Sequence, residues 1–429
     1  MLLMSRIRAL LSLLGPGVLM ATAAVGGSHL VASTQAGAKF GWQLAILILV
    51  VNILKYPFFR AGVSYTISTQ NTLQQGYLSM GKRYLASAMC LNMIACVVNA
   101  AALLLFAASL LSYFMPFDIS ITTSSSIVLS LILVILLAGH FEGLDNIAKA
   151  IMGVLVVATI AVFIVALLRY TNTDLGEPAE PSPSPWTLAT LGFLVVTMGW
   201  MPAPIEISSI TSLWLKRQCK DKTVTPKNAL FDFNLGYSVT VLLAILFLGL
   251  GALVLHSSGE NLATSGIGFS HQLISMYSTT IGEWAHWLIA LVAFLCIFGS
   301  ALTVYDGYAR VVAEGMSLLS GKNDLSQPNA PTKTAVSNRL VTGVLLVMAA
   351  VSFVIVLFFK SALLAMLGFA MTLAFTTTPV FAWLNHRLVA RSQLHPDAAP
   401  STWVTAVSYL GLLYLFGFLL VFVWWKWLA

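Results

Sequence analysis

The sequence predicts an all-α polytopic membrane protein with about eleven transmembrane helices. Of its 429 residues, 59% are hydrophobic and only 9% are charged, and the mean hydropathy is +0.90. A soluble domain carries about 25% charged residues. Several apolar runs exceed ~18 residues, which is the length that crosses the hydrocarbon core of a bilayer. These observations exclude a large soluble protein, and no polar connection is long enough to fold as a separate domain.

Eleven apolar segments follow one another along the chain. Arg6 and Arg8 precede the first segment as they would in a signal peptide, but the apolar run is too long and has no convincing cleavage site. We therefore expect this segment to be retained. The predicted spans lie roughly at 13–38, 42–69, 84–113, 121–140, 144–170, 188–214, 230–256, 281–316, 336–358, 361–386 and 402–427.

The charged residues are distributed unevenly between alternate connections. If the N-terminus is cytoplasmic, most Lys and Arg residues fall on inner segments, whereas the outer connection 171–187 is acidic and rich in proline. This positive-inside pattern predicts a multi-pass protein of the cell (plasma) membrane with an extracytoplasmic C-terminus. The positive-inside distribution in the lipid bilayer therefore explains the formal charge of +7, and we expect no nucleic-acid partner.

Two of the predicted spans are interrupted at matching positions. The first span contains Gly26-Gly27-Ser28-His29, and the sixth contains GWMPAPIEISS at 199–209, whose two prolines cannot continue a helix. Interruptions at corresponding places in two halves indicate a secondary transporter built from inverted repeats. We expect five-helix repeats at about 13–170 and 188–386 in a core of residues 1–400, followed by an additional helix within 401–429.

A broken helix offers hydrogen-bond donors and acceptors at the centre of the membrane. Ser28 is the expected N-cap of the outer half of span 1, and Pro204 suits the first turn of the inner half of span 6. Both half-helix N-termini would then direct free N–H groups toward the bilayer centre. The half-helices that end there leave carbonyl groups free near Ala23 and Met198. Together these groups suit a dehydrated ion or a small polar solute.

Three sequence motifs resemble the Nramp family of proton-coupled divalent-metal transporters. They are GPG at 15–17, QAGAKFGW at 35–42 and MP at 201–202, and Asn52 also fits the family pattern in span 2. The resemblance implies the fold of the sodium-coupled amino-acid transporters, with ten core helices in two inverted repeats and with alternating access. We expect a transporter and not an enzyme, since no nucleophile–base pair or metal–water constellation is present. We also expect no cofactor, because Cys90, Cys96, Cys219 and Cys296 lack metal-binding spacing.

The residues at the implied metal site differ from those of the family. The family motif Asp-Pro-Gly-Asn falls on Gly26, Gly27, Ser28 and His29; Met-Pro-His falls on Met201, Pro202 and Ala203; and a glutamine of span 10 falls on Thr372. The family also has acidic residues in span 3, whereas residues 1–117 contain no Asp or Glu. Of the implied ligands, the Met201 thioether and backbone carbonyls remain, and they bring no charge to compensate a desolvated divalent cation.

Two ionisable residues lie inside the predicted membrane. Lys55 is about 13 residues into span 2, or ~20 Å from its outer end, and an ionisable residue at such depth suggests function. Glu206 lies at the start of the inner half of span 6, where the helix dipole favours an anion. The sequence leaves open whether Lys55 forms an ion pair with Glu206. Glu206 is either a structural cap, a partner of Lys55 or a group for proton coupling.

The sequence leaves three kinds of cargo open. The first, which the charge balance favours, is a small inorganic anion such as bicarbonate, bound by two helix N-termini, Ser28, His29 and Lys55. The second is a divalent transition-metal ion held by His29, Met201 and backbone carbonyls. The third is a small neutral or zwitterionic solute, with Trp200 in its pocket. Symport with a proton or a sodium ion is the expected form of coupling.

Overall fold

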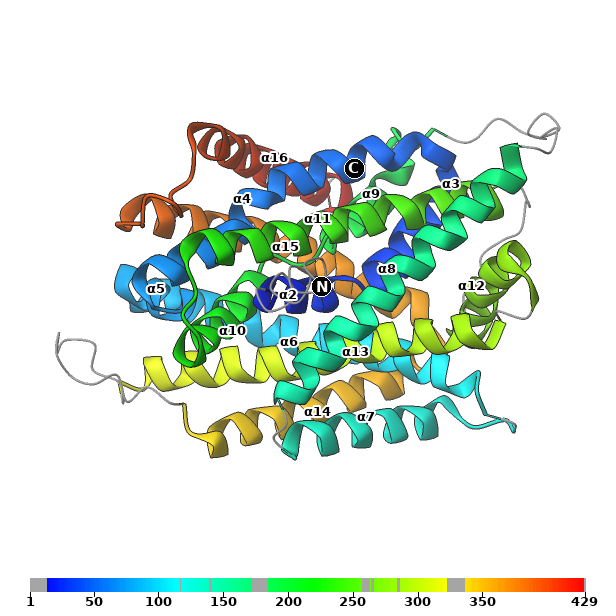
Figure 1. Ribbon diagram of the computed structural model, residues 1–429, viewed down its shortest axis with the longest axis horizontal. Coiled ribbons are helices and arrows are strands. Elements are labelled where there is room, and N and C mark those ends of the chain that lie inside the picture. Colours follow the sequence, from blue (N-terminus) through cyan, green and yellow to red (C-terminus); the bar gives the residue numbers. More distant parts are fainter. Residues whose placement is uncertain are drawn as a thin grey trace, which may run out of the picture.

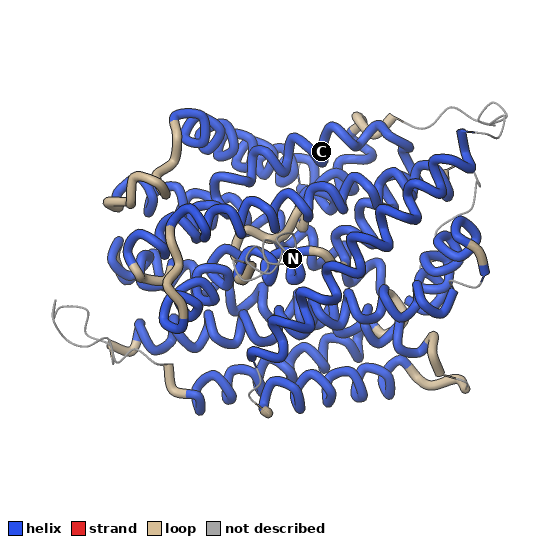
Figure 2. The backbone as a smooth tube through the Cα atoms, viewed as in Figure 1, coloured by secondary structure: helices blue, strands red, loops and turns tan. Residues whose placement is uncertain are grey.

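The computed structural model consists of helices joined by turns and short loops, and no strand occurs in the parts that it describes (Figure 2). The described residues are 14–115, 117–138, 141–171, 184–256, 263, 266–283, 286–321 and 336–427. Arg6 and Arg8 lie outside them. The all-α prediction is therefore confirmed.

Each of the eleven predicted spans contains at least one helix. The first part of the chain comprises α2 (Pro16–Ala24), η1 (Ser28–Ser33), α3 (Thr34–Phe40), η2 (Gly41–Leu44), α4 (Ala45–Thr69), α5 (Leu73–Met80), α6 (Lys82–Ser112), α7 (Ile121–Leu137) and α8 (Phe141–Thr171). The rest of the chain comprises η3 (Leu188–Thr190), α9 (Leu191–Gly199), α10 (Ile207–Asp221), α11 (Pro226–Leu250), η4 (Gly251–Leu255), α12 (Gly266–Ile281), α13 (His286–Leu319), α14 (Asn338–Phe359), α15 (Leu363–Arg391) and α16 (Thr402–Trp427).

Eight helical segments of the described chain are long and apolar enough to cross a membrane. The predicted spans 1 and 6 are not among these as single helices, because both are broken, and the helix Ile121–Leu137 in span 4 is shorter. The two breaks expected from glycine and proline are thus present.

Two short helices were not expected from the sequence. The helix α5 begins with a capping box in which Thr72 and Gln75 bond to each other's backbone N–H groups, and it ends at Gly81, whose φ is 133°. The helix α12 lies in the connection between spans 7 and 8. Both are too short to cross a bilayer, so a search for long apolar runs does not find them.

The half-helix α2 lies at the centre of the bundle (Figure 1). It packs against α11, α10 and α13, while α6 and α13 form the most extensive helix pair. The helices α7 and α14 lie along one edge of the view in Figure 1, and α4 and α16 lie along the opposite edge. The half-helices α2 and α10 of the two broken spans therefore pack against each other inside the bundle.

The GPG motif fixes the N-terminal end of α2 against α11. The N–H groups of Gly15 and Gly17 donate to the two carboxylate oxygens of Asp232 at 3.0 and 2.7 Å. A Cβ on Gly17 would lie against the backbone of Asp232, and a Cβ on Gly236 would lie against the Gly17 carbonyl. The glycines therefore allow the two helix backbones to touch, and Asp232 satisfies N–H groups that the helix start leaves free.

Candidate functional site

The break in span 1 is short and has no side-chain N-cap. The helix α2 ends at Ala24, Gly26 separates the halves, and the chain resumes as the π-helical segment η1. The expected capping role of Ser28 is wrong, because its hydroxyl donates backward to the Ala24 carbonyl at 2.9 Å. The Ser28 side chain therefore does not accept a hydrogen bond from the first backbone N–H groups of the second half-helix, near Gly26 and Gly27.

His29 is fully buried and turned toward α11. Its Nε2 lies 2.9 Å from the Thr240 carbonyl, and its Nδ1 lies 2.7 Å from the Ser28 hydroxyl. Since a carbonyl only accepts, Nε2 carries a proton. The ring thus links span 1 to α11, and it does not line the cavity between the two breaks.

The break in span 6 is occupied by a lysine. The Lys55 ammonium donates to the Met198 carbonyl at 2.7 Å and to the Gly199 carbonyl at 3.1 Å, at the end of α9. Its side chain is completely buried. The ion pair with Glu206, one of the alternatives that the sequence left open, does not form: Glu206 Oε1 accepts from Tyr308, and Oε2 has no hydrogen-bond partner. Lys55 instead satisfies carbonyls that would otherwise end a half-helix inside the membrane.

Three further predicted site residues make local contacts. Asn52 donates to the Ile48 carbonyl at 2.7 Å, and Thr372 donates to the Gly368 carbonyl at 2.8 Å. Met201 is fully buried in a cluster of apolar side chains. None of the three lines the cavity between the breaks. As metal, cargo or coupling residues they stay predictions.

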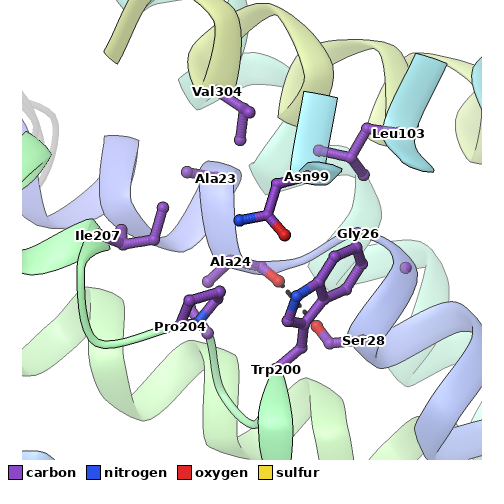
Figure 3. A pocket seen from close by; sticks show the side chains of 12 residues that line it. Ala23, Ala24, Gly26, Ser28, Asn99, Leu103, Trp200, Pro204, Ile207 and Val304 are labelled. Atoms are coloured by element: carbon purple, nitrogen blue, oxygen red, sulfur yellow. Dashed lines mark hydrogen bonds between the residues drawn. The ribbon is translucent and has the colours of Figure 1, made fainter. Parts of the chain in front are cut away.

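A small cavity lies between the two breaks (Figure 3). The space that it leaves open to a water-sized sphere is about 20 Å³, which is room for about one water molecule. It combines the predicted residues of the first break and Ala203 with side chains of α6, α10 and α13. The lining residues are Ala23, Ala24, Gly26, Gly27, Ser28, Asn99, Leu103, Trp200, Ala203, Pro204, Ile207 and Val304.

The polar groups of the cavity are few, and none is a carboxylate. The Trp200 side chain is 5% exposed, and its indole N–H has no hydrogen-bond partner. The Asn99 amide enters from α6, with its oxygen toward Trp200 and Gly26 (Figure 3). Among the described residues no group of three or more His, Cys, Asp or Glu side chains is arranged to hold a metal. The cavity therefore offers an unused donor and no negative charge.

The structure adds Asn99 and Tyr308 to the residues near the site. Asn99 donates to the Tyr308 hydroxyl at 3.0 Å, and Tyr308 donates to Glu206 at 3.3 Å. One signal could have found Asn99 from the sequence: it is a polar residue within the long apolar run of span 3. Tyr308 had none, because a buried tyrosine is common in any helical core.

Comparisons with known proteins place the chain in a family. The family model described as natural resistance-associated macrophage protein-like (Nramp) matches residues 17–425. An uncharacterised protein of Pasteurella multocida (strain Pm70) is 44% identical over 410 residues, which cover 96% of this chain and 91% of that protein.

Two solved structures have a similar fold. The manganese transporter of Eremococcus coleocola, in complex with an aromatic bis-isothiourea substituted compound, superposes with a TM-score of 0.69 at 15% identity, covering 97% of this chain and 87% of that one. MhsT in complex with L-phenylalanine gives a TM-score of 0.65 at 13% identity, covering 96% and 98%. At these identities the likeness extends to the fold alone. The matched family, which spans nearly the whole chain, identifies this protein as a member of the Nramp family, a multi-pass membrane transporter and not an enzyme.

Proposed function

We propose that this transporter carries a small monovalent anion with a planar oxygen-bearing group, bicarbonate being the candidate, by alternating access. One observation carries the proposal: the Trp200 indole N–H lines the cavity, is buried and has no acceptor within the protein. A buried donor without a partner costs about 1–3 kcal/mol. An oxyanion in the cavity would supply the missing acceptor.

The helix ends around the cavity support the same cargo. The outer half of span 1 begins at Gly26 and Gly27, and Pro204 precedes the inner half of span 6. Half-helix N-termini carry partial positive charge and bind anions. The negative ends of the half-helices are less available, since Lys55 already occupies the carbonyls of Met198 and Gly199. An anion thus meets complementary charge in this cavity, whereas a cation does not.

A divalent transition-metal ion is the second candidate. Membership of the family and the fold shared with a manganese transporter favour it, and Met201 stands where the family motif has its methionine. Against it, hard divalent cations require carboxylate or carbonyl oxygen ligands, and the cavity wall contains no carboxylate. A metal would have to bind near Met201 and His29, away from this cavity. The neutral or zwitterionic solute stays a prediction that no single contact favours.

The test is uptake into proteoliposomes of bicarbonate, formate, acetate and manganese, measured side by side. Formate and acetate share a carboxylate and differ by one methyl group. Comparing their uptake therefore separates recognition of the oxyanion from contact of an apolar group with Leu103 and Val304. We expect saturable anion uptake, and we expect Trp200→Phe to raise its KM about tenfold, the equivalent of one hydrogen bond of ~1.4 kcal/mol.

Trp214→Phe is the matched control for that substitution. Trp214 is also buried in span 6 with an unpartnered indole N–H, but it does not line the cavity, so its replacement should leave the KM unchanged. Saturable manganese uptake that is lost in Met201→Ala, together with no uptake of any anion, would overturn the proposal in favour of the metal.

We further propose that the protein lies in the cell membrane with its N-terminus in the cytoplasm and its C-terminus outside. Four basic side chains support this orientation, because cytoplasmic ends of membrane helices carry an excess of Lys and Arg. They line one pocket at the ends of α10 and α13, and they are Lys216, Arg217, Lys220 and Arg310. Labelling of single cysteines placed near Lys220 and near Trp427 by an impermeant reagent tests this. The reagent should reach only the C-terminal position in intact cells.

A further inference from the structure

A chain of hydrogen bonds leads from the cavity to a buried carboxylate. The Asn99 Nδ2 group donates to the Tyr308 hydroxyl at 3.0 Å, and that hydroxyl donates to Glu206 Oε1 at 3.3 Å. All three side chains are buried, with exposed fractions of 5%, 0% and 0%. The second carboxylate oxygen of Glu206 has no hydrogen-bond partner. Asn99 belongs to the cavity wall, so one end of the chain faces the cargo.

The ionised state of Glu206 fixes the direction of every bond in this chain. A carboxylate can only accept hydrogen bonds, so the single hydroxyl proton of Tyr308 must point at Glu206. The Tyr308 oxygen then needs a donor from Asn99, which places the amide Nδ2 on the Tyr308 side. The Asn99 oxygen is consequently left on the cavity side, as Figure 3 shows.

Protonation of Glu206 at Oε1 permits the opposite direction. The carboxylic O–H then donates to the Tyr308 oxygen, and the Tyr308 hydroxyl donates to an Asn99 oxygen. The amide must rotate by half a turn to bring its oxygen to Tyr308, which directs its two N–H donors into the cavity. One proton is gained and no covalent bond other than that O–H bond forms or breaks.

We propose that Glu206, Tyr308 and Asn99 form a proton-operated switch that changes the cavity wall from a hydrogen-bond acceptor to a donor. This inference rests on the proposed anion cargo. An anion binds poorly beside the amide oxygen and well beside the amide N–H groups. Binding of the anion and protonation of Glu206 therefore favour each other, and by linkage the effect is reciprocal. The expected stoichiometry is one proton with one anion, moved in the same direction.

The groups around Glu206 allow the carboxyl to exist in both states. From α4, Lys55 lies close enough to attract the ionised form, but it donates its own hydrogen bonds to the Met198 and Gly199 carbonyls. From α5, the titratable neighbour is Tyr77, and from α13 it is Tyr308. The helix α2, which also packs on α10, contributes no titratable side chain. No close ion pair fixes the charge state of Glu206, since its Oε1 accepts from Tyr308 and its Oε2 has no hydrogen-bond partner.

The test is the affinity of the detergent-purified protein for bicarbonate and for formate, measured by calorimetry at several pH values. The concentration of bicarbonate is set separately at each pH. At pH values above the pKa of Glu206, the wild-type Kd should rise up to about tenfold per pH unit, because one proton is bound with each anion. Glu206→Gln presents a permanent side-chain donor to Tyr308, so it should bind as tightly as the protonated wild type at every pH.

Tyr308→Phe removes the link while leaving the carboxyl in place. We expect its Kd to be weak and independent of pH, and we expect anion uptake to continue without the accompanying proton influx that a trapped pH dye detects. Tyr305→Phe is the matched control, since Tyr305 is a buried tyrosine of the same helix whose hydroxyl bonds to Ser352. It should retain the wild-type pH dependence.

The outcomes separate this inference from the proposed function. If no anion binds to the wild type at any pH, both are overturned. If anions bind but the pH dependence of Tyr308→Phe equals that of the wild type, the switch is overturned and the anion cargo stands.

Discussion

The two broken helices share an interrupted backbone inside an apolar bundle, but they complete it in different ways. In span 6 the carbonyl end of α9 is closed by Lys55, and a Cβ on Gly199 would lie against the backbone carbonyl of Met371. In span 1 the nearest atoms to a Cβ on Gly26 or Gly27 are mostly side-chain atoms, and the break opens onto the cavity. Protein groups thus fill the carbonyl side of the break in span 6, whereas the cavity lies between the break in span 1 and the Trp200 and Pro204 side of the break in span 6.

The largest expected effect follows from the filled break. Gly199→Ala places a methyl group against the Met371 backbone, and a backbone carbonyl in a long helix cannot move aside. We expect little or no folded protein, measured as the monodisperse fraction on size-exclusion chromatography after extraction in detergent. Gly27→Ala is the matched control, because its Cβ would lie 2.8 Å from the edge of the Trp200 ring. That variant should fold and lose transport, and equal folding of both variants would remove the distinction between the breaks.

The next effect concerns the lysine itself. Lys55→Met removes two hydrogen bonds from a charged donor at the end of α9, where the Met198 carbonyl would keep only backbone N–H donors. We expect the free energy of unfolding to fall by roughly 3 kcal/mol, measured by denaturant or thermal unfolding in detergent. If Lys55 stands in for a bound cation, sodium ions but not choline should restore part of this stability, because the exposed carbonyls resemble an ion site.

Lys39→Met gives the control for charge removal. Lys39 is an exposed residue that lies over the Phe193 ring at 5.1 Å, so its loss should change the stability by less than about 1 kcal/mol. Unchanged stability of Lys55→Met would mean that the break in span 6 needs no internal cation, and the contrast with span 1 would disappear.

The sequence predicted the fold well because length and interruption are local properties. Long apolar runs predict spans, and Gly26, Gly27, Pro202 and Pro204 predict where two of them break. The π-helical register of Ser28–Ser33 could not be predicted, since it depends on which carbonyls the surrounding helices leave available. Lys55 is fully buried, but its partners are carbonyls more than a hundred residues away along the chain, which local sequence does not reveal.

The candidate site was predicted less completely. Gly26, Gly27, Ser28, Ala23 and Ala203 line the cavity as expected. His29 was placed in the site because it adjoins the break, yet one helical position turns its ring toward α11. Asn99 was missed because a single asparagine in an apolar helix is equally typical of helix-to-helix packing. Whether such a residue lines the cavity depends on the direction of its side chain and on long-range hydrogen bonds, and local sequence predicts neither.

The smallest expected effect tests where the cargo site ends. The family resemblance put Thr372 in the site, but its hydroxyl donates to the Gly368 carbonyl within α15 and does not line the cavity. Thr372→Ala removes only this local bond, worth about 1 kcal/mol, so transport of the anion should stay within about twofold of wild type by initial rates in proteoliposomes. Thr376→Ala, which removes the equivalent bond to Leu373 one turn later, is the control. A selective loss of transport in Thr372→Ala would extend the cargo site from the open break toward α15.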